Sequence, residues 1–106
     1  MSVQQIKQKI KNDKKVKHPY IIQKRGVCGG SPIISGTRTP VRSIVGYYKM
    51  GLSVDEILEG LPYLIPAQVY DALSYYYDHQ NKIEEEIARS AEEELMKKYP
   101  ETVFKR

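Results

Sequence analysis

Hydrophobic residues recur at helical spacing through the middle of the chain and predict three short amphipathic helices. The first starts at an N-cap, Thr39, with Pro40 in the first helical position, and ends at Gly51. Its apolar positions follow the i, i+3, i+4, i+7 pattern of one buried face: Val41, Ile44, Val45 and Tyr48. The second helix, at about 54–59, opens on a capping box formed by Ser53 and Glu56.

A third helix begins at Pro66 and continues the same pattern. Its buried stripe consists of four apolar residues: Val69, Ala72, Leu73 and Tyr76. Because helices of this length are not stable alone, we expect the three stripes to share one core.

Beyond Tyr77 the apolar positions become a narrow seam on a highly charged background. The seam consists of Ile83, Ile87, Ala91 and Leu95. An unbroken helix from Pro66 to Lys98 would contain 33 residues and extend about 50 Å, which exceeds a globule of this size. We therefore expect this helix to break, to protrude or to pair with a second chain.

Two β-branched or aromatic runs, 20–22 and 32–34, precede the helices and flank a glycine-rich segment. They predict a short β-hairpin that must pack on the helices or on another subunit. The predicted fold class is therefore mainly α, with a helix-turn-helix domain preceded by a β-hairpin. We expect a basic N-terminal arm (1–18), the hairpin plus helix-turn-helix domain (19–79) and a charged helical C-terminal extension (80–106).

Charge is segregated along the chain of 106 residues. Residues 1–25 carry a net charge of +7, residues 26–51 +3, residues 52–79 −5 and residues 80–106 −1, which gives +4 overall. The single cysteine, Cys28, excludes an internal disulfide, and no Cys/His cluster has zinc spacing. The sequence has no apolar run of membrane-spanning length and no apolar leader, so we expect a cytoplasmic protein without membrane contact and without a cofactor.

No group of residues has the spacing of a catalytic site. The segment from Gly26 to Pro32 lacks the phosphate-loop patterns and is interpreted as a structural turn. Cys28 has no base at a recognisable spacing, so a small packed residue is the favoured interpretation over a nucleophile. The glutamate runs 84–86 and 92–94 surround a charged helix instead of forming an acid/base pair. We expect a protein that is not an enzyme.

The run from Ser53 to Tyr77 has the order of a helix-turn-helix, which admits DNA binding. The candidate DNA-binding residues are Lys14, Lys15, Lys17, Lys24, Arg25, Arg38, Arg42, Gln68 and Ser74. However, no Lys or Arg occurs between Leu52 and His79, although phosphate neutralisation supplies most non-specific affinity. A helical core with no nucleic-acid role is equally well supported. For Arg38, internal pairing with Glu56 or Glu59 is favoured over a phosphate contact.

Four segments together resemble a family of small bacterial proteins, domain of unknown function 433. They read GVCGGSPIISGTRTPV at 26–41, GLSVDEIL at 51–58, PYL at 62–64 and VYDALSY at 69–75. The signature residues are Gly29, Gly30, Pro32, Gly36, Thr37, Arg38 and Pro40. The resemblance implies a homeodomain-like three-helix domain and the role of antitoxin in a toxin–antitoxin pair, beside a PIN-like nuclease toxin.

Two functions follow as hypotheses. The first is a dimeric, antitoxin-like helix-turn-helix regulator that binds its toxin and its own operator DNA. The alternative is a protein–protein interaction module without DNA binding, whose acidic helices mask a basic partner.

Overall fold

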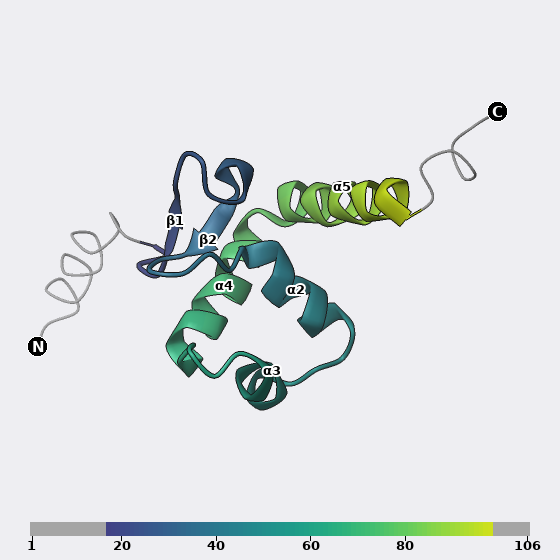
Figure 1. Ribbon diagram of the computed structural model, residues 1–106. Coiled ribbons are helices and arrows are strands. Elements are labelled where there is room, and N and C mark those ends of the chain that lie inside the picture. Colours follow the sequence, from purple (N-terminus) through teal and green to yellow (C-terminus); the bar gives the residue numbers. More distant parts are fainter. Residues whose placement is uncertain (1–16, 99–106) are drawn as a thin grey trace, which may run out of the picture.

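The computed structural model describes residues 17–98, and this part of the chain is mainly helical, as predicted. It contains a two-stranded antiparallel hairpin and four α-helices (Figure 1). The elements are β1 (Ile21–Gln23), the 3-10 turn η2 (Cys28–Gly30), β2 (Pro32–Ile34), α2 (Val41–Lys49), α3 (Val54–Gly60), α4 (Pro66–Asp78) and α5 (Gln80–Lys98). None of these helices is long and apolar enough to cross a membrane.

The hairpin pairs β1 with β2, and Ile22 lies opposite Ile33. The predicted glycine-rich turn contains η2, where Gly29 and Gly30 have φ of 64° and 83°. Glycine tolerates this left-handed region without steric cost. Cys28 also has a positive φ, 49°, and its thiol donates to the carbonyl oxygen of Arg38 at 3.1 Å. That bond ties the turn to the segment that leads from β2 into α2.

The predicted N-cap at Thr39 is wrong: α2 begins at Val41 and Pro40 occupies the N-cap position. The physical reason is backbone pairing with β2. Ile34 N–H donates to the carbonyl of Thr39, and Pro40 forms a bridge with Ile33, so residues 39 and 40 stay extended. The Thr39 hydroxyl hydrogen-bonds to the hydroxyl of Tyr63 in the α3–α4 connector instead.

Both other predicted helix starts are confirmed. Ser53 caps α3 in a capping box with Glu56, and Pro66 is the first residue of α4. The predicted stripe of α4 is buried and packs on α2 and α3. One cluster therefore forms the core: Ile34, Val41, Ile44, Val45, Ile57, Leu64, Val69, Ala72, Leu73, Tyr76 and Ile83.

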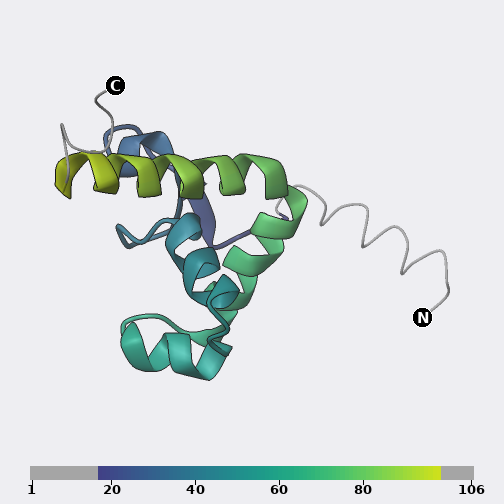
Figure 2. The same ribbon diagram turned by 90° about the vertical axis from the view of Figure 1, so that its right-hand side faces the viewer.

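Of the outcomes expected for the helical pattern from Pro66 to Lys98, a break is found: it lies at His79, whose φ and ψ are −133° and 42°. The chain turns there, and α5 packs across α2 before it projects beyond the core (Figures 1 and 2). Ile83 in α5, which follows the domain boundary predicted at residue 79, is fully buried in the core, and Ile87 packs against it. Residues 91–97 are exposed.

Candidate functional site

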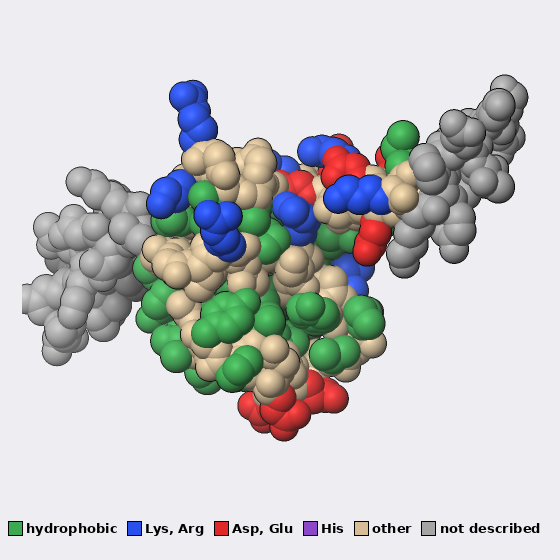
Figure 3. Space-filling view, viewed as in Figure 1, with side chains coloured by type: hydrophobic (Ala, Val, Ile, Leu, Met, Phe, Trp, Pro, Cys, Tyr) green, Lys and Arg blue, Asp and Glu red, His purple; other side chains and the backbone are tan. Residues whose placement is uncertain are grey.

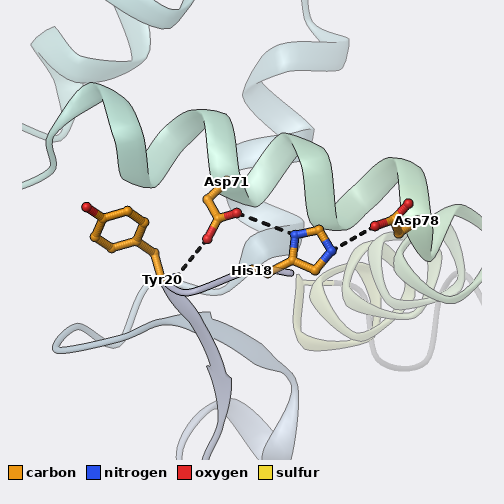
Figure 4. Close-up of polar contacts among 4 residues, drawn as sticks. All are labelled: His18, Tyr20, Asp71 and Asp78. Atoms are coloured by element: carbon orange, nitrogen blue, oxygen red, sulfur yellow. Dashed lines mark hydrogen bonds and ion pairs between the residues drawn. The ribbon is translucent and has the colours of Figure 1, made fainter. Parts of the chain in front are cut away.

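A polar cluster around His18 joins the segment that precedes β1 to helix α4 through hydrogen bonds (Figure 4). The two ring nitrogens of His18 lie 3.4 Å from an Asp71 oxygen and 2.8 Å from an Asp78 oxygen. The other Asp71 oxygen accepts from the backbone N–H of Tyr20 at 2.8 Å. The shorter contact, to Asp78, has the length of a hydrogen bond, and the longer one places the second ring nitrogen beside Asp71.

The cluster also includes aromatic contacts: the His18 ring meets Tyr75 edge-on, with centroids 5.2 Å apart. Sequence reasoning missed this cluster because 53 and 60 residues separate His18 from its two partners. The only available signal was the seven-residue spacing of Asp71 and Asp78, two helical turns that place both carboxylates on one face of α4.

Two predicted DNA-binding cations, Lys24 and Arg38, line one surface hollow of about 440 Å³ beside the hairpin. Its apolar part is formed by Ile22, Val27 and Ile33. Lys17 and Arg25, which lie before and after β1 in the sequence, are also exposed. Figure 3 shows Lys and Arg side chains gathered around the hairpin. Lys14 and Lys15 lie outside the described residues.

The predicted pairing of Arg38 with Glu56 or Glu59 is wrong. Among residues 17–98, Arg38 forms no ion pair, because α3 lies at the opposite end of the helical core from the hairpin (Figures 1 and 2). The Arg38 side chain is exposed and open to an external anion.

The other predicted site residues lie elsewhere. Arg42 is half-buried, and its Nη1 lies 3.7 Å from Glu86 Oε1 of α5. That oxygen is buried and receives no hydrogen bond from the described residues. The Gln68 side chain accepts from the backbone N–H of Ile65, so it caps α4. Ser74, the remaining predicted residue, is exposed on the outer side of α4.

The pair Arg42–Glu86 lies at a polar hollow of about 250 Å³ between η2 and α5. Cys28, Ser31, Arg89 and Glu93 also line it, so the hollow carries charges of both signs. Within the described residues, no three His, Cys, Asp or Glu side chains gather as metal ligands would.

Exposed tyrosines mark the outer side of α4 and the end of α2. Tyr70 and Tyr77 are 61% and 56% exposed and flank Ser74 along α4. Tyr48 of α2 joins them, since its hydroxyl lies 3.1 Å from that of Tyr77. This hydrogen bond raises the pKa of Tyr77 above its ordinary value of 10.0. We call these residues, Tyr48, Tyr70, Ser74 and Tyr77, the tyrosine face.

Acidic side chains concentrate on α3, at the end of the molecule away from the hairpin (Figure 3). Asp55, Glu56 and Glu59 are all exposed, and α3 contains no Lys or Arg. The backbone N–H of Ser53 donates to the Glu56 carboxylate and lowers its pKa, so this carboxylate stays ionised. The cations around the hairpin and the carboxylates of α3 therefore lie at opposite ends of the helical core (Figures 1 and 3).

Fold and surface together define a small helical domain with a β-hairpin at one end. The chain belongs to the family described as "Protein of unknown function (DUF433)", whose model matches residues 21–76. The crystal structure of a DUF433 member protein from Anabaena variabilis ATCC 29413 is similar, with a TM-score of 0.63 and 31% sequence identity. That similarity covers 83% of this chain and 86% of that chain. No curated protein matched.

Proposed function

We propose that this protein is a non-enzymatic, antitoxin-like module that binds a basic partner protein through the tyrosine face and the acidic helix α3. The observation that carries the proposal is the set of large apolar side chains left exposed on α2, α4 and their connections. They are Tyr47, Tyr48, Met50, Tyr63, Ile65, Tyr70 and Tyr77. Exposed apolar patches of this kind mark interaction sites, and Tyr and Met are enriched in protein interfaces.

Charge favours a basic partner. Residues 52–79 contain five carboxylates and no Lys or Arg. Tyrosine rings also attract Lys and Arg through their π faces, so the tyrosine face and the carboxylates select for the same partner charge. The family resemblance implies a PIN-like nuclease toxin as this partner, and a nuclease that binds RNA needs the basic surface that this charge pattern would cover.

The test is co-expression with the product of the adjacent gene, followed by affinity measurement with two face variants, Tyr70→Ala and Ser74→Arg. Both side chains are exposed, so we expect the fold to remain intact. If Tyr70 is an interface anchor, affinity falls on the order of tenfold or more. Met96→Ala is the matched control, since Met96 is an apolar residue on α5 that is 50% exposed, against 61% for Tyr70. Unchanged affinity in both face variants would refute this surface.

DNA binding is a second candidate function, favoured by the convergence of Lys24 and Arg38 on one hollow. In this proposal α2, α3 and α4 form the homeodomain-like unit of an operator-binding homodimer, and the hairpin cations contact phosphate. The exposed side of α4 offers Ser74 between two tyrosines and no cation.

A mobility-shift titration with the upstream DNA at two salt concentrations tests this second function. Lys24→Gln and Arg38→Gln should each weaken binding across all sequences and lower the slope of log affinity against log salt by about 1. If the protein binds random DNA as tightly as the upstream DNA, the proposed role as a regulator of its own operator is refuted. Sedimentation of the protein alone reports whether it is a dimer.

A further inference from the structure

A small apolar pocket opens between the C-terminal end of α2 and α3. Its volume is about 140 Å³, and its lining residues are Tyr47, Leu52, Glu56, Ile57, Gly60 and Leu61. An apolar cavity of about 150 Å³ is large enough to hold a benzene ring, so this pocket has room for one aliphatic side chain. Glu56 stands at its edge, and Asp55 and Glu59 are exposed on the same short helix. The pocket therefore suits an aliphatic side chain that is flanked by cations.

The chain itself contains a segment with this pattern. Residues 1–16, which precede the described part, contain five lysines and one aspartate. Within them, Ile10 stands directly between Lys9 and Lys11.

We propose that residues 9–11 dock on α3 of the same molecule, with Ile10 in the pocket and the two flanking lysines beside Glu56 and Glu59. The docked segment covers the pocket and neutralises the acidic end of the domain. This inference does not depend on the proposed function. If both are right, a basic partner must displace the segment before it can reach α3.

The attachment point of the segment allows it to reach α3. His18 is held on α4 by Asp71 and Asp78, so the preceding residues start from the C-terminal half of α4. Figure 2 shows α3 at the other end of α4. The 13 residues of α4 make it about 20 Å long. His18 lies eight positions after Ile10, so an extended chain between them spans up to about 26 Å, which exceeds that length.

Charge directs the segment to α3 in preference to α5. Helix α3 carries three carboxylates and no cation in seven residues, a net charge of −3. Helix α5 has six glutamates but also four Lys or Arg, so its net charge is −2 over 19 residues. The four cations of α5 therefore offset part of its attraction for lysines, whereas the charged groups of α3 are all attracting.

The first experiment is carbodiimide cross-linking of the full chain, which joins a lysine directly to a carboxylate that it touches. An equal mixture of unlabelled and ¹⁵N-labelled protein separates links within one chain from links between chains. We expect links from Lys9 or Lys11 to Glu56 or Glu59, within one chain, in low salt. Their yield should fall several-fold at about 0.5 M salt, where screening acts within a few ångströms. Links spread evenly over the glutamates of α5, or links only between chains, would overturn the proposal.

A second experiment tests the isoleucine. Ile10→Ser should shift the backbone amide resonances of Gly60 and Leu61 in the ¹⁵N-labelled full chain, because it empties the pocket. Ile6→Ser, four residues earlier in the same segment, is the matched control and should leave them unchanged. Equal shifts from both variants, or none from Ile10→Ser, would refute docking at this pocket.

A charge exchange distinguishes direct contact from a general charge effect. Glu59→Lys should reduce the cross-link yield several-fold, and so should Lys9→Glu combined with Lys11→Glu. The variant that carries all three changes should regain the shifts of Gly60 and Leu61 seen in the parent protein. Glu59 lies in the last turn of α3, where lysine is favourable to the helix dipole, so this variant should fold. A triple variant that stays undocked would contradict the pairing.

Discussion

Substituting Ile83 by alanine tests whether α5 belongs to the core. Ile83 is completely buried in the cluster formed by α2, α3 and α4. Large-to-small substitutions at such sites cost about 2–5 kcal/mol, because apolar transfer energy is lost and a cavity remains. This is a large share of the roughly 5–15 kcal/mol that stabilises a domain. For a domain of this size, a loss of about 3 kcal/mol lowers Tm by about 12–24 °C.

The assay is urea and thermal unfolding, followed by far-UV circular dichroism. Leu95→Ala is the matched control, since Leu95 lies on the same helix but is 45% exposed. Its effect should stay within about 0.5 kcal/mol. If Ile83→Ala costs no more than this control, α5 does not contribute to the core, and the argument from burial fails.

Three further predictions concern the polar contacts. Ser53→Ala should lower the free energy of unfolding by about 1 kcal/mol through loss of the α3 N-cap, measured by urea titration against the exposed Ser74→Ala. Arg42→Ala should cost about 1–3 kcal/mol because it leaves the buried Glu86 carboxylate without its ion pair, and adding Glu86→Gln should recover part of this loss in a double-mutant cycle. The pKa of Glu56 is lowered below its ordinary 4.5, so its stabilising contribution is present above that value and is lost as the pH falls through the folded pKa. The difference in unfolding free energy between the parent and Glu56→Gln should therefore shrink as the pH falls from 7 to 3, and a constant difference would refute the capping role.

Local sequence signals predicted the starts of helices correctly where the stabilising contact joins residues that are close in the sequence. The capping box at Ser53 and the start at Pro66 depend on residues at most three positions apart, and both are confirmed. The stripe of α4 is also confirmed, because helical periodicity alone determines which side chains share one face.

Predictions failed where contacts between segments distant in the sequence determine the backbone conformation or the partner of a side chain. Thr39 has the side chain of an N-cap, but its carbonyl pairs with Ile34 and keeps it extended. Arg38 was expected to pair within the chain, yet the fold places α3 too far away. The His18 cluster joins residues more than 50 positions apart, and no local pattern marks such a contact.

The candidate site was predictable only in part for the same reason. The sequence showed that residues 1–51 carry a net charge of +10 and that residues 52–79 carry −5. It did not show that Lys24 and Arg38 would line one hollow, or that Gln68 would cap α4. The exposed tyrosines were also missed as a surface: Tyr48 was assigned to the buried face of the first helix, but it is 39% exposed.

The way α5 leaves the core divides it into two parts of different local stability. Amides near Ile83 and Ile87 can exchange with deuterium only when the packed domain opens, because their side chains are held in or against the core. Residues 91–97 are exposed and can open by fraying from the C-terminal end of the helix. Exchange should therefore accelerate along α5 toward Lys98, so the distal half can unwind or be cut by a protease while the rest of the domain stays folded.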